Sequence, residues 1–277
     1  MREGGLRVRA IGWSLVAFWL GLLAGGAAEG DEFHERFTYD VRWAGISVGR
    51  AELDLRVSEE ADERRSARRF SARTHGWVSK VKAVDTRIES IETVSEEGVI
   101  RQEVLKSMRE GKFRQEDYLV IDGASRMAHW VDQISGEEAS YEAPPGVLDY
   151  VSFLVSLRDA GVWKAEDPQL FRLLMDRGVH ELELSVIGDE GRGGKSRMDA
   201  RTRRLRVLSR SPDLFVRNVP REIRVCRESE VVVGLDASTR LGRVTLVLTE
   251  WIRNGETMEM PGSGIAATGT PVRKREG

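Results

Sequence analysis

Cysteine is nearly absent from this sequence. Its 277 residues include one cysteine, Cys226, so no disulfide within the chain can stabilise the fold. A catalytic thiol is not indicated, because no histidine stands at a motif spacing from Cys226. We therefore expect Cys226 to be a buried or half-buried strand residue, and we expect stability to come from a hydrophobic core.

Metal-binding and cofactor-binding motifs are also missing. The four histidines form no H-x-x-x-H or H-E-x-x-H pair, which argues against a zinc site; they are His34, His75, His129 and His180. The segment that ends in Gly194-Lys195-Ser196 is not a phosphate-binding loop, because Asp189 stands where its first glycine would be. The sequence thus predicts no metal and no cofactor.

Catalytic residues are not indicated either. Ser152 and Ser156 lie outside any Gly-x-Ser-x-Gly elbow. With 45 acidic residues, a carboxylate pair for hydrolysis cannot be picked out by position. We therefore predict no catalytic residue, and a non-catalytic protein is favoured over an enzyme.

A strong excess of charge of one sign is lacking. The 43 basic and 45 acidic residues give a formal net charge of -2, which provides no reason to expect a nucleic-acid partner. Both signs alternate along the same segments, as expected of solvated faces.

The N-terminal segment has the organisation of a secretory signal. Arg2, Arg7 and Arg9 precede an apolar run at residues 11–23, and small residues follow up to Ala28. That run is shorter than the ~20 residues of a membrane-spanning helix. We expect residues 1–28 to be a signal peptide and the mature protein, with no transmembrane segment, to be in the periplasm or cell envelope. The alternative is a retained membrane anchor.

Most of the remaining chain has the period-two pattern of half-buried strands. Phe37, Tyr39, Val41 and Trp43 alternate with polar residues, and a long closing strand is expected at residues 241–252. Residues 59–65 are predicted to be a charged loop. The pattern ends near residue 253, so residues 29–253 are expected to form one β-rich domain and residues 254–277 a disordered tail.

One segment has helical spacing instead. Apolar residues at 147–158 recur at i, i+3, i+4 and i+7, after Pro144-Pro145 and before Gly161. Asp149 and Arg158 have the signs that the helix dipole favours and are interpreted as structural residues of the helix ends. The predicted fold is mainly β: an antiparallel up-and-down curved sheet or partly closed barrel with one internal α-helix at about 147–160.

Three segments resemble the 3108 family of domains of unknown function, which are exported bacterial proteins. They are residues 43–51 with the turn Gly45-Ile46-Ser47-Val48-Gly49, residues 147–158 with Asp149 and Arg158, and residues 242–246. The resemblance covers roughly residues 33–252. It implies a β-rich periplasmic or envelope protein without assigned activity, and by fold analogy alone a half-barrel like those of envelope lipid carriers.

Aromatic side chains provide the candidate ligand site, although an ordinary hydrophobic core is the better explanation of the set as a whole. The candidate ligand-binding residues are Tyr39, Trp43, Trp77, Tyr118, Tyr150 and Phe153. The leading hypothesis is a protein that binds a lipid or another hydrophobic or amphipathic small molecule inside the curved sheet. The alternatives are an assembly factor that contacts envelope proteins, and an envelope hydrolase.

Overall fold

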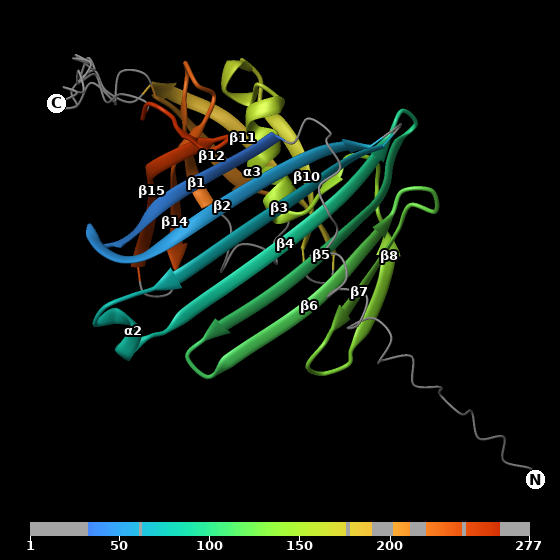
Figure 1. The fold of residues 1–277 in the computed structure, drawn as a ribbon, viewed down its shortest axis with the longest axis horizontal. Helices are drawn as coiled ribbons and strands as arrows, with labels where there is room; N and C mark the ends of the chain where they lie inside the picture. Colours follow the sequence, from blue (N-terminus) through green and yellow to red (C-terminus); the bar gives the residue numbers. More distant parts are fainter. Residues whose placement is uncertain are drawn as a thin grey trace, which may run out of the picture. The chain divides into compact units, whose positions relative to one another are not determined.

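A single large β-sheet dominates the structure (Figure 1). The computed structural model describes residues 33–60, 63–175, 178–189, 202–210, 220–239 and 242–260, which belong to one unit. The predicted signal peptide and most of the predicted tail lie outside these residues. No helix among the described residues combines the length and apolar character needed to cross a membrane.

Sixteen strands make up the sheet. They are β1 (Phe33–Trp43), β2 (Ile46–Glu60), β3 (Glu63–Thr74), β4 (Val84–Ser95), β5 (Gly98–Glu110), β6 (Phe113–Asp122), β7 (Met127–Asp132), β8 (Glu138–Glu142), β9 (Val147–Leu148), β10 (Gln169–Met175), β11 (Gly178–Asp189), β12 (Thr202–Ser209), β13 (Pro220–Cys226), β14 (Val232–Thr239), β15 (Gly242–Arg253) and β16 (Glu256–Thr257).

Neighbouring strands in the sheet are mostly neighbours in sequence. The order is β8-β7-β6-β5-β4-β3-β2-β1-β15-β14-β13-β12-β11-β10-β9, and β16 pairs with β15. All pairs are antiparallel except β9 with β10. The up-and-down sheet predicted from the period-two pattern is therefore confirmed, and β1 against β15 joins its two halves.

The sheet curls but does not close. Its edge strands β8 and β9 are connected by residues 143–146 only, so Glu142 and Val147 are at most ~18 Å apart. Pro144 and Pro145 lie in this connection and have no N–H to donate to a ladder. The chain thus holds the two edges near each other while the proline pair prevents this segment from pairing regularly with either.

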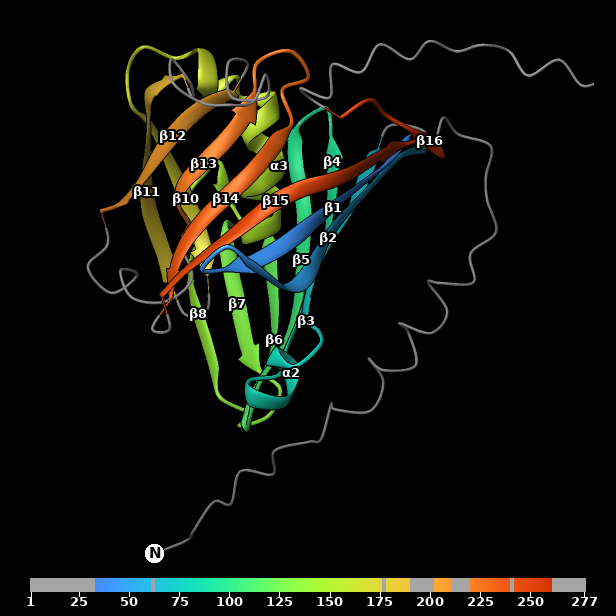
Figure 2. The same cartoon turned by 90° about the vertical axis from the view of Figure 1, so that its left-hand side faces the viewer.

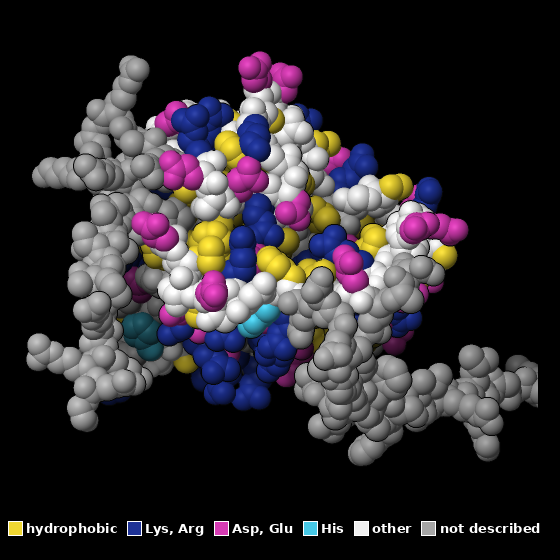
Figure 3. Space-filling view, turned by 45° about the horizontal axis from the view of Figure 1, so that its top comes forward, with side chains coloured by type: hydrophobic (Ala, Val, Ile, Leu, Met, Phe, Trp, Pro, Cys, Tyr) yellow, Lys and Arg dark blue, Asp and Glu magenta, His cyan; other side chains and the backbone are white. Residues whose placement is uncertain are grey.

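Alternation along the strands separates an inner face from an outer face. On β1, Phe37 and Tyr39 are buried in the core, while Arg36 and Arg42 make ion pairs on the other face. On the face shown in Figure 3, basic and acidic side chains are interspersed, with hydrophobic side chains between them. The mixed charges therefore form a solvated outer surface, as the sequence indicated.

The internal helix α3 (Tyr150–Asp159) packs inside the curve. It contacts β3 and β4 on one side and β10 and β14 on the other, so it lies between the two halves of the sheet (Figure 2). Its first residues differ from the prediction of about 147–160. Val147 and Leu148 pair in parallel with β10, and the helix begins only after its N-cap, Asp149.

Two further differences concern segments predicted to be irregular. The charged segment 59–65 is largely strand, because β2 runs to Glu60 and β3 starts at Glu63. The sheet also continues past residue 253: Asn254 and Gly255 both have positive φ, 49° and 82°, and form the turn into β16. Met258 and Met260 then pack on the core. An Asn-Gly pair is a strong signal for a β-hairpin turn, so this turn could have been recognised from the sequence.

The other helical segments are short. α2 (Val78–Val81) follows β3, and the 3-10 helix η1 (Val162–Lys164) follows α3. Gly161, the expected helix stop, has φ 58° between α3 and η1. Neither short segment alters the arrangement of one sheet curved around α3.

Candidate functional site

The N-terminus of α3 is held by a buried carboxylate. Asp149 is 1% exposed, and its Oδ1 caps the helix by accepting hydrogen bonds from the backbone N–H of Val151 at 2.7 Å and Ser152 at 3.1 Å. Its Oδ2 accepts bonds from the Ser90 hydroxyl on β4 at 2.7 Å and from Gln102 Nε2 on β5 at 2.5 Å. The Ser152 hydroxyl donates to Oδ2 as well. Both oxygens are thus used structurally, which argues against an acid or base role for Asp149.

This network extends to β3. Arg68 Nη1 donates to the Ser152 hydroxyl at 2.8 Å, and Arg68 Nη2 donates to Glu92 at 2.5 Å. Both side chains of that ion pair are 14% exposed. Three neighbouring strands therefore fix the position of the helix start.

The C-terminal end of α3 is held by a second buried carboxylate. Glu35 on β1 is 0% exposed and accepts hydrogen bonds from Arg158 at 2.5 Å and from Arg253 on β15 at 2.7 Å. The Trp251 indole N–H donates to the same carboxylate at 3.2 Å. Asp149 and Arg158, interpreted from the sequence as structural residues of the helix ends, therefore each connect one helix end to the sheet.

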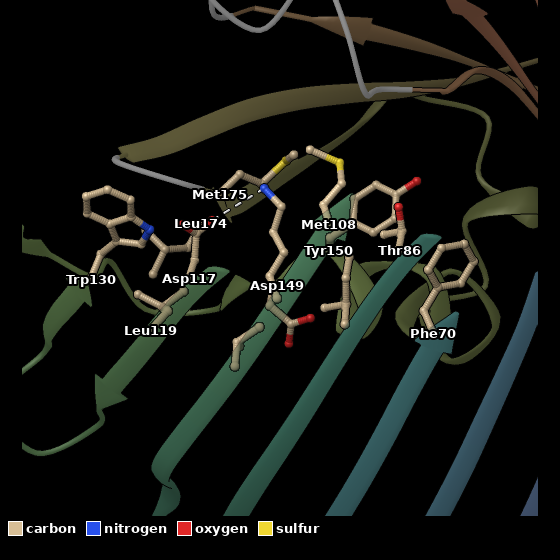
Figure 4. A pocket seen from close by; sticks show the side chains of 13 residues that line it. Phe70, Thr86, Met108, Asp117, Leu119, Trp130, Asp149, Tyr150, Leu174 and Met175 are labelled. Carbon is tan, nitrogen blue, oxygen red and sulfur yellow. Dashed lines mark ion pairs between the residues drawn. The ribbon is translucent and has the colours of Figure 1, made fainter. Parts of the chain in front are cut away.

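A cavity of about 190 Å³ lies beside the start of the helix. The strands β3 to β7 form one wall, and the helix start and the end of β10 contribute the remainder (Figure 4). Most lining side chains are apolar: Phe70, Ile88, Val104, Met108, Leu119, Trp130, Tyr150, Leu174 and Met175. A largely apolar lining with few polar groups is typical of small-molecule sites.

The polar lining residues of the cavity are Thr86, Lys106, Asp117 and Asp149, and two of them, Lys106 and Asp117, form a charge pair. Lys106 Nζ on β5 lies 3.5 Å from Asp117 Oδ2 on β6, and the side chains are 18% and 5% exposed (Figure 4). Gln115 donates to Asp117 at 2.7 Å. Because the two charges offset each other, the pair offers donors and acceptors to a ligand without a net charge of its own.

Tyr150 adds a phenol to the cavity wall. Burial raises its pKa to about 12, so the group is neutral at physiological pH. Its ring packs edge-on against Phe70, with 6.4 Å between the ring centroids. Tyr150 therefore presents an uncharged surface to the cavity.

The other candidate aromatic residues lie elsewhere. Tyr39 is buried in the core and its hydroxyl donates to the Val232 carbonyl at 3.1 Å, and Phe153 is 0% exposed. Tyr118 lies on the outer face, where it donates to Glu103 at 3.0 Å. Trp43 is half-buried at the end of β1, and Trp77 is 57% exposed. Of the six, the structure brings only Tyr150 to this cavity.

Sequence reasoning missed the charged pair of the cavity. Lys106 occupies the same inward alternation as Val104 and Met108, so a lysine at an inward strand position was the available signal. On β6, Asp117 stands two positions before the inward residue Leu119, so the alternation of the strand places Asp117 on the inner face too. Pairing of β5 with β6 then places Lys106 directly opposite Asp117.

A metal centre is not indicated by the described part of the chain. No three His, Cys, Asp or Glu side chains in it converge as metal ligands would. His34 hydrogen-bonds to Asp54 and His129 to Ser140, on different strands, and Cys226 is buried. The geometry is suited to holding a molecule of mixed polarity, with its apolar part against the strands and a polar group near Lys106 and Asp117.

Comparisons of this chain with protein families, curated proteins and solved structures identify its family. The crystal structure of a beta-barrel-like protein of domain of unknown function DUF1849 from Brucella abortus aligns with 84% of this chain and 100% of its own, at 9% identity and a TM-score of 0.49. No curated protein matches the chain. The family model described as "Protein of unknown function (DUF3108)" matches residues 38–249. The chain, with its curved sheet and enclosed helix, therefore belongs to the DUF3108 family.

Proposed function

We propose that this protein binds a hydrophobic or amphipathic small molecule, such as a lipid, in the cavity beside the start of α3. The cavity, with its apolar walls and the charge pair of Lys106 and Asp117, is the observation that carries the proposal; the Asp149 carboxylate also lines it, with its oxygens bonded at the helix start. A dry apolar cavity of about 150 Å³ accommodates a benzene ring. The cavity here, at about 190 Å³, has room for a ring or a short acyl segment.

The charge pair indicates the chemistry of the ligand's polar part. An ionic ligand group would compete with Lys106 or Asp117 for its partner, and breaking a buried pair is costly. A neutral or zwitterionic group can hydrogen-bond to both side chains without separating them. We therefore infer a ligand with an apolar segment and a neutral or zwitterionic polar group.

The proposed location is the periplasm or cell envelope, and the proposed role is non-catalytic. The location is supported by the basic and apolar N-terminal segment before residue 29. The role is supported by the use of Asp149 as a helix cap and by a cavity that offers apolar area more than reactive groups.

Binding of the neutral apolar fluorophore N-phenyl-1-naphthylamine tests the proposal. Val104→Phe places a larger side chain in the cavity, whereas the control Leu105→Phe introduces the same residue type on the outer face of the same strand. We expect Val104→Phe to weaken binding at least tenfold and Leu105→Phe to leave it unchanged. Met175→Trp fills the cavity from the opposite wall and serves if Val104→Phe fails to fold.

Native mass spectrometry of protein purified without detergent gives a second measurement. We expect a bound lipid-sized mass that is lost in the variant that fills the cavity. Absence of any bound mass, together with fluorophore binding that is equal in all variants, would rule the proposed function out.

A further inference from the structure

Three hairpin tips at one end of the sheet each expose a large hydrophobic side chain. Trp77 stands just before α2, between β3 and β4; Phe113 starts β6; Ile134 lies between β7 and β8. They are 57%, 53% and 55% exposed. Because the strands run alternately up and down, these tips share one rim, and Figures 1 and 2 both show α2 and the two turns at the same end. Single exposed hydrophobic residues are ordinary, but several on one rim mark an interaction surface.

Two of these tips are fixed to each other. The backbone N–H of Gly111 donates to the carbonyl of Ala83 at 2.9 Å, and Lys82 forms an ion pair with Glu110. The tip with Trp77 is therefore anchored to the tip that begins at Phe113. A side chain on an ordered tip loses little further conformational freedom when it inserts into a partner.

The outer face next to these tips is basic. A groove of about 280 Å³ runs over β3 to β6, and four arginines and two carboxylates line it: Arg73, Arg87, Arg109, Arg114, Asp85 and Glu116. Arg73 is paired with Asp85 at 3.0 Å. Two lysines, Lys80 and Lys112, are exposed on the tips themselves.

Arg109 and Arg114 indicate an anionic partner. They are directly opposite each other on β5 and β6, and no ion pair of either is found in the described part of the chain. Asp85 stands opposite Arg109 on β4, but it is paired with Arg73. Like charges opposite each other on neighbouring strands destabilise a sheet. An anion between them would remove this repulsion, and guanidinium groups bind phosphate in bidentate fashion.

We propose that this tip rim, made of Trp77, Phe113 and Ile134 with Arg109 and Arg114 behind them, docks on an anionic lipid surface. Tryptophan and other large apolar side chains enter the boundary between headgroups and acyl chains, and basic residues at that depth bind anionic headgroups. The tip rim presents both groups together, which favours a membrane over a purely apolar or purely anionic partner.

The opposite rim provides an internal comparison. Val99 and Ile100 are each 42% exposed there, but Glu96 and Glu97 precede them and are exposed too. Acidic residues beside an apolar tip are repelled by an anionic surface. On the tip rim, Lys80 and Lys112 are exposed next to Trp77 and Phe113, whereas Glu137 and Glu138 are exposed beside Ile134. The contrast in charge with the opposite rim therefore holds for the tips with Trp77 and Phe113.

Docking through the tip rim does not depend on what the cavity binds, but it would bring the cavity close to the lipid. Thr86 and Met108 line the cavity and pair with each other two register positions from the final pair, Val84 with Glu110. At ~3.4 Å per residue, that end of the cavity is about 7 Å from the end of the strands. A ligand could then pass between membrane and cavity over a short distance.

Vesicle flotation tests the proposal on a chain that begins at Glu29, after the predicted signal peptide, and that contains all the described residues. The vesicles are phosphatidylcholine alone or with 30% phosphatidylglycerol, a composition chosen for about a third of anionic lipid. We expect binding to the anionic vesicles only. Trp77→Ser and Phe113→Ser should each weaken it by about tenfold. Arg109→Gln and Arg114→Gln should each weaken it by about fivefold and reduce its salt dependence.

Ile100→Ser is the matched control at the opposite rim and should bind as the parent chain does. Thermal melts establish that each variant is folded. Failure to bind anionic vesicles, or equal binding by the tip and control variants, would overturn the proposal. A dimer that is lost in Trp77→Ser would also overturn it, because the rim would then be a contact between copies. Loss of fluorophore binding in Val104→Phe without loss of flotation would separate this proposal from that of the cavity.

Discussion

Arg158, near the end of α3, donates a hydrogen bond of 2.5 Å to Glu35, a fully buried carboxylate on β1 that precedes it by 123 residues. Glu35 also binds Arg253 and the Trp251 indole. One carboxylate thus connects the helix to the two strands that join the halves of the sheet. Because the partners come from distant parts of the chain, the contact links the helix to the global fold.

Removing the arginine should therefore destabilise the whole domain. We expect Arg158→Met to lower the free energy of unfolding by about 1–3 kcal/mol, since Arg253 still neutralises part of the buried charge. Urea denaturation gives the measurement. The double variant that combines Arg158→Met with Glu35→Gln should lose less free energy of unfolding than the sum of the losses in the two single variants. Strict additivity would show that the two side chains are not coupled.

Replacing Asp149 at the start of the helix should lower the free energy of unfolding at least as much as replacing Arg158 at its end. Asp149→Ala removes the cap and leaves the buried donors of Ser90 and Gln102 without this acceptor, so we expect a loss of about 2–4 kcal/mol. Ser156→Ala is the control on the same helix, because the carbonyl of Phe153 is the one partner to which its hydroxyl donates among the described residues. A thermal melt that is the same for both variants would contradict the proposed role of Asp149.

Tyr150 should make the protein sensitive to alkali. Its pKa is raised to about 12 by burial, whereas an unfolded tyrosine titrates near pH 10. The contribution of Tyr150 to the free energy of unfolding is fully present below about pH 10. It is lost as the pH rises toward about 12, because in this range the unfolded state releases the phenol proton and the folded state keeps it. We expect Tyr150→Phe to become more stable than the parent over this window, by on the order of 2 kcal/mol at its upper end.

Urea denaturation at a series of pH values from 8 to 12 would measure this difference. Part of the alkaline sensitivity should remain in Tyr150→Phe, because burial also raises the pKa of Tyr39. Unfolding free energies of parent and variant that stay parallel through the series would refute the prediction.

The two glycines of the first hairpin should respond differently to substitution. A Cβ at Gly49 would lie 2.4 Å from the backbone carbonyl oxygen of Arg73, so Gly49→Ala should cost about 1–3 kcal/mol by forcing β2 and β3 apart. Gly45 has open space around it and a φ of +83°, a conformation that asparagine tolerates. Gly45→Asn should therefore cost less than about 1 kcal/mol. A chemical denaturation series that ranks the two in the reverse order would contradict this reading.

The fold was largely predictable because its signals are local. Alternation at Phe37, Tyr39 and Val41 is sufficient to identify a strand with one buried face, and the helical spacing after Pro145 identifies the one long helix. The start of that helix was misplaced because Val147 and Leu148 fit either period. Their pairing with β10, more than 20 residues later, decided the matter.

The site was less predictable, because its residues come from different strands. Tyr150 was identified as an aromatic residue on the helix, but Lys106 and Asp117 had no motif to mark them. Aromatic content alone selected residues that lie in the core, such as Phe153, and on the outer face, such as Tyr118. Whether a side chain faces a cavity depends on how the sheet curls, which no short segment encodes.

The amino-acid sequence by itself determined that this chain is an antiparallel sheet with one amphipathic helix, since hydrophobic periodicity and proline act over a few residues. Only the tertiary structure decided which distant residues hold the two helix ends, namely Glu35 at Arg158 and Ser90 and Gln102 at Asp149. It also decided that Lys106 meets Asp117 beside an apolar cavity, and that Trp77, Phe113 and Ile134 share one rim. These relationships depend on strand register and sheet curvature, which arise from pairing between distant segments and from the closure that Pro144 and Pro145 leave incomplete.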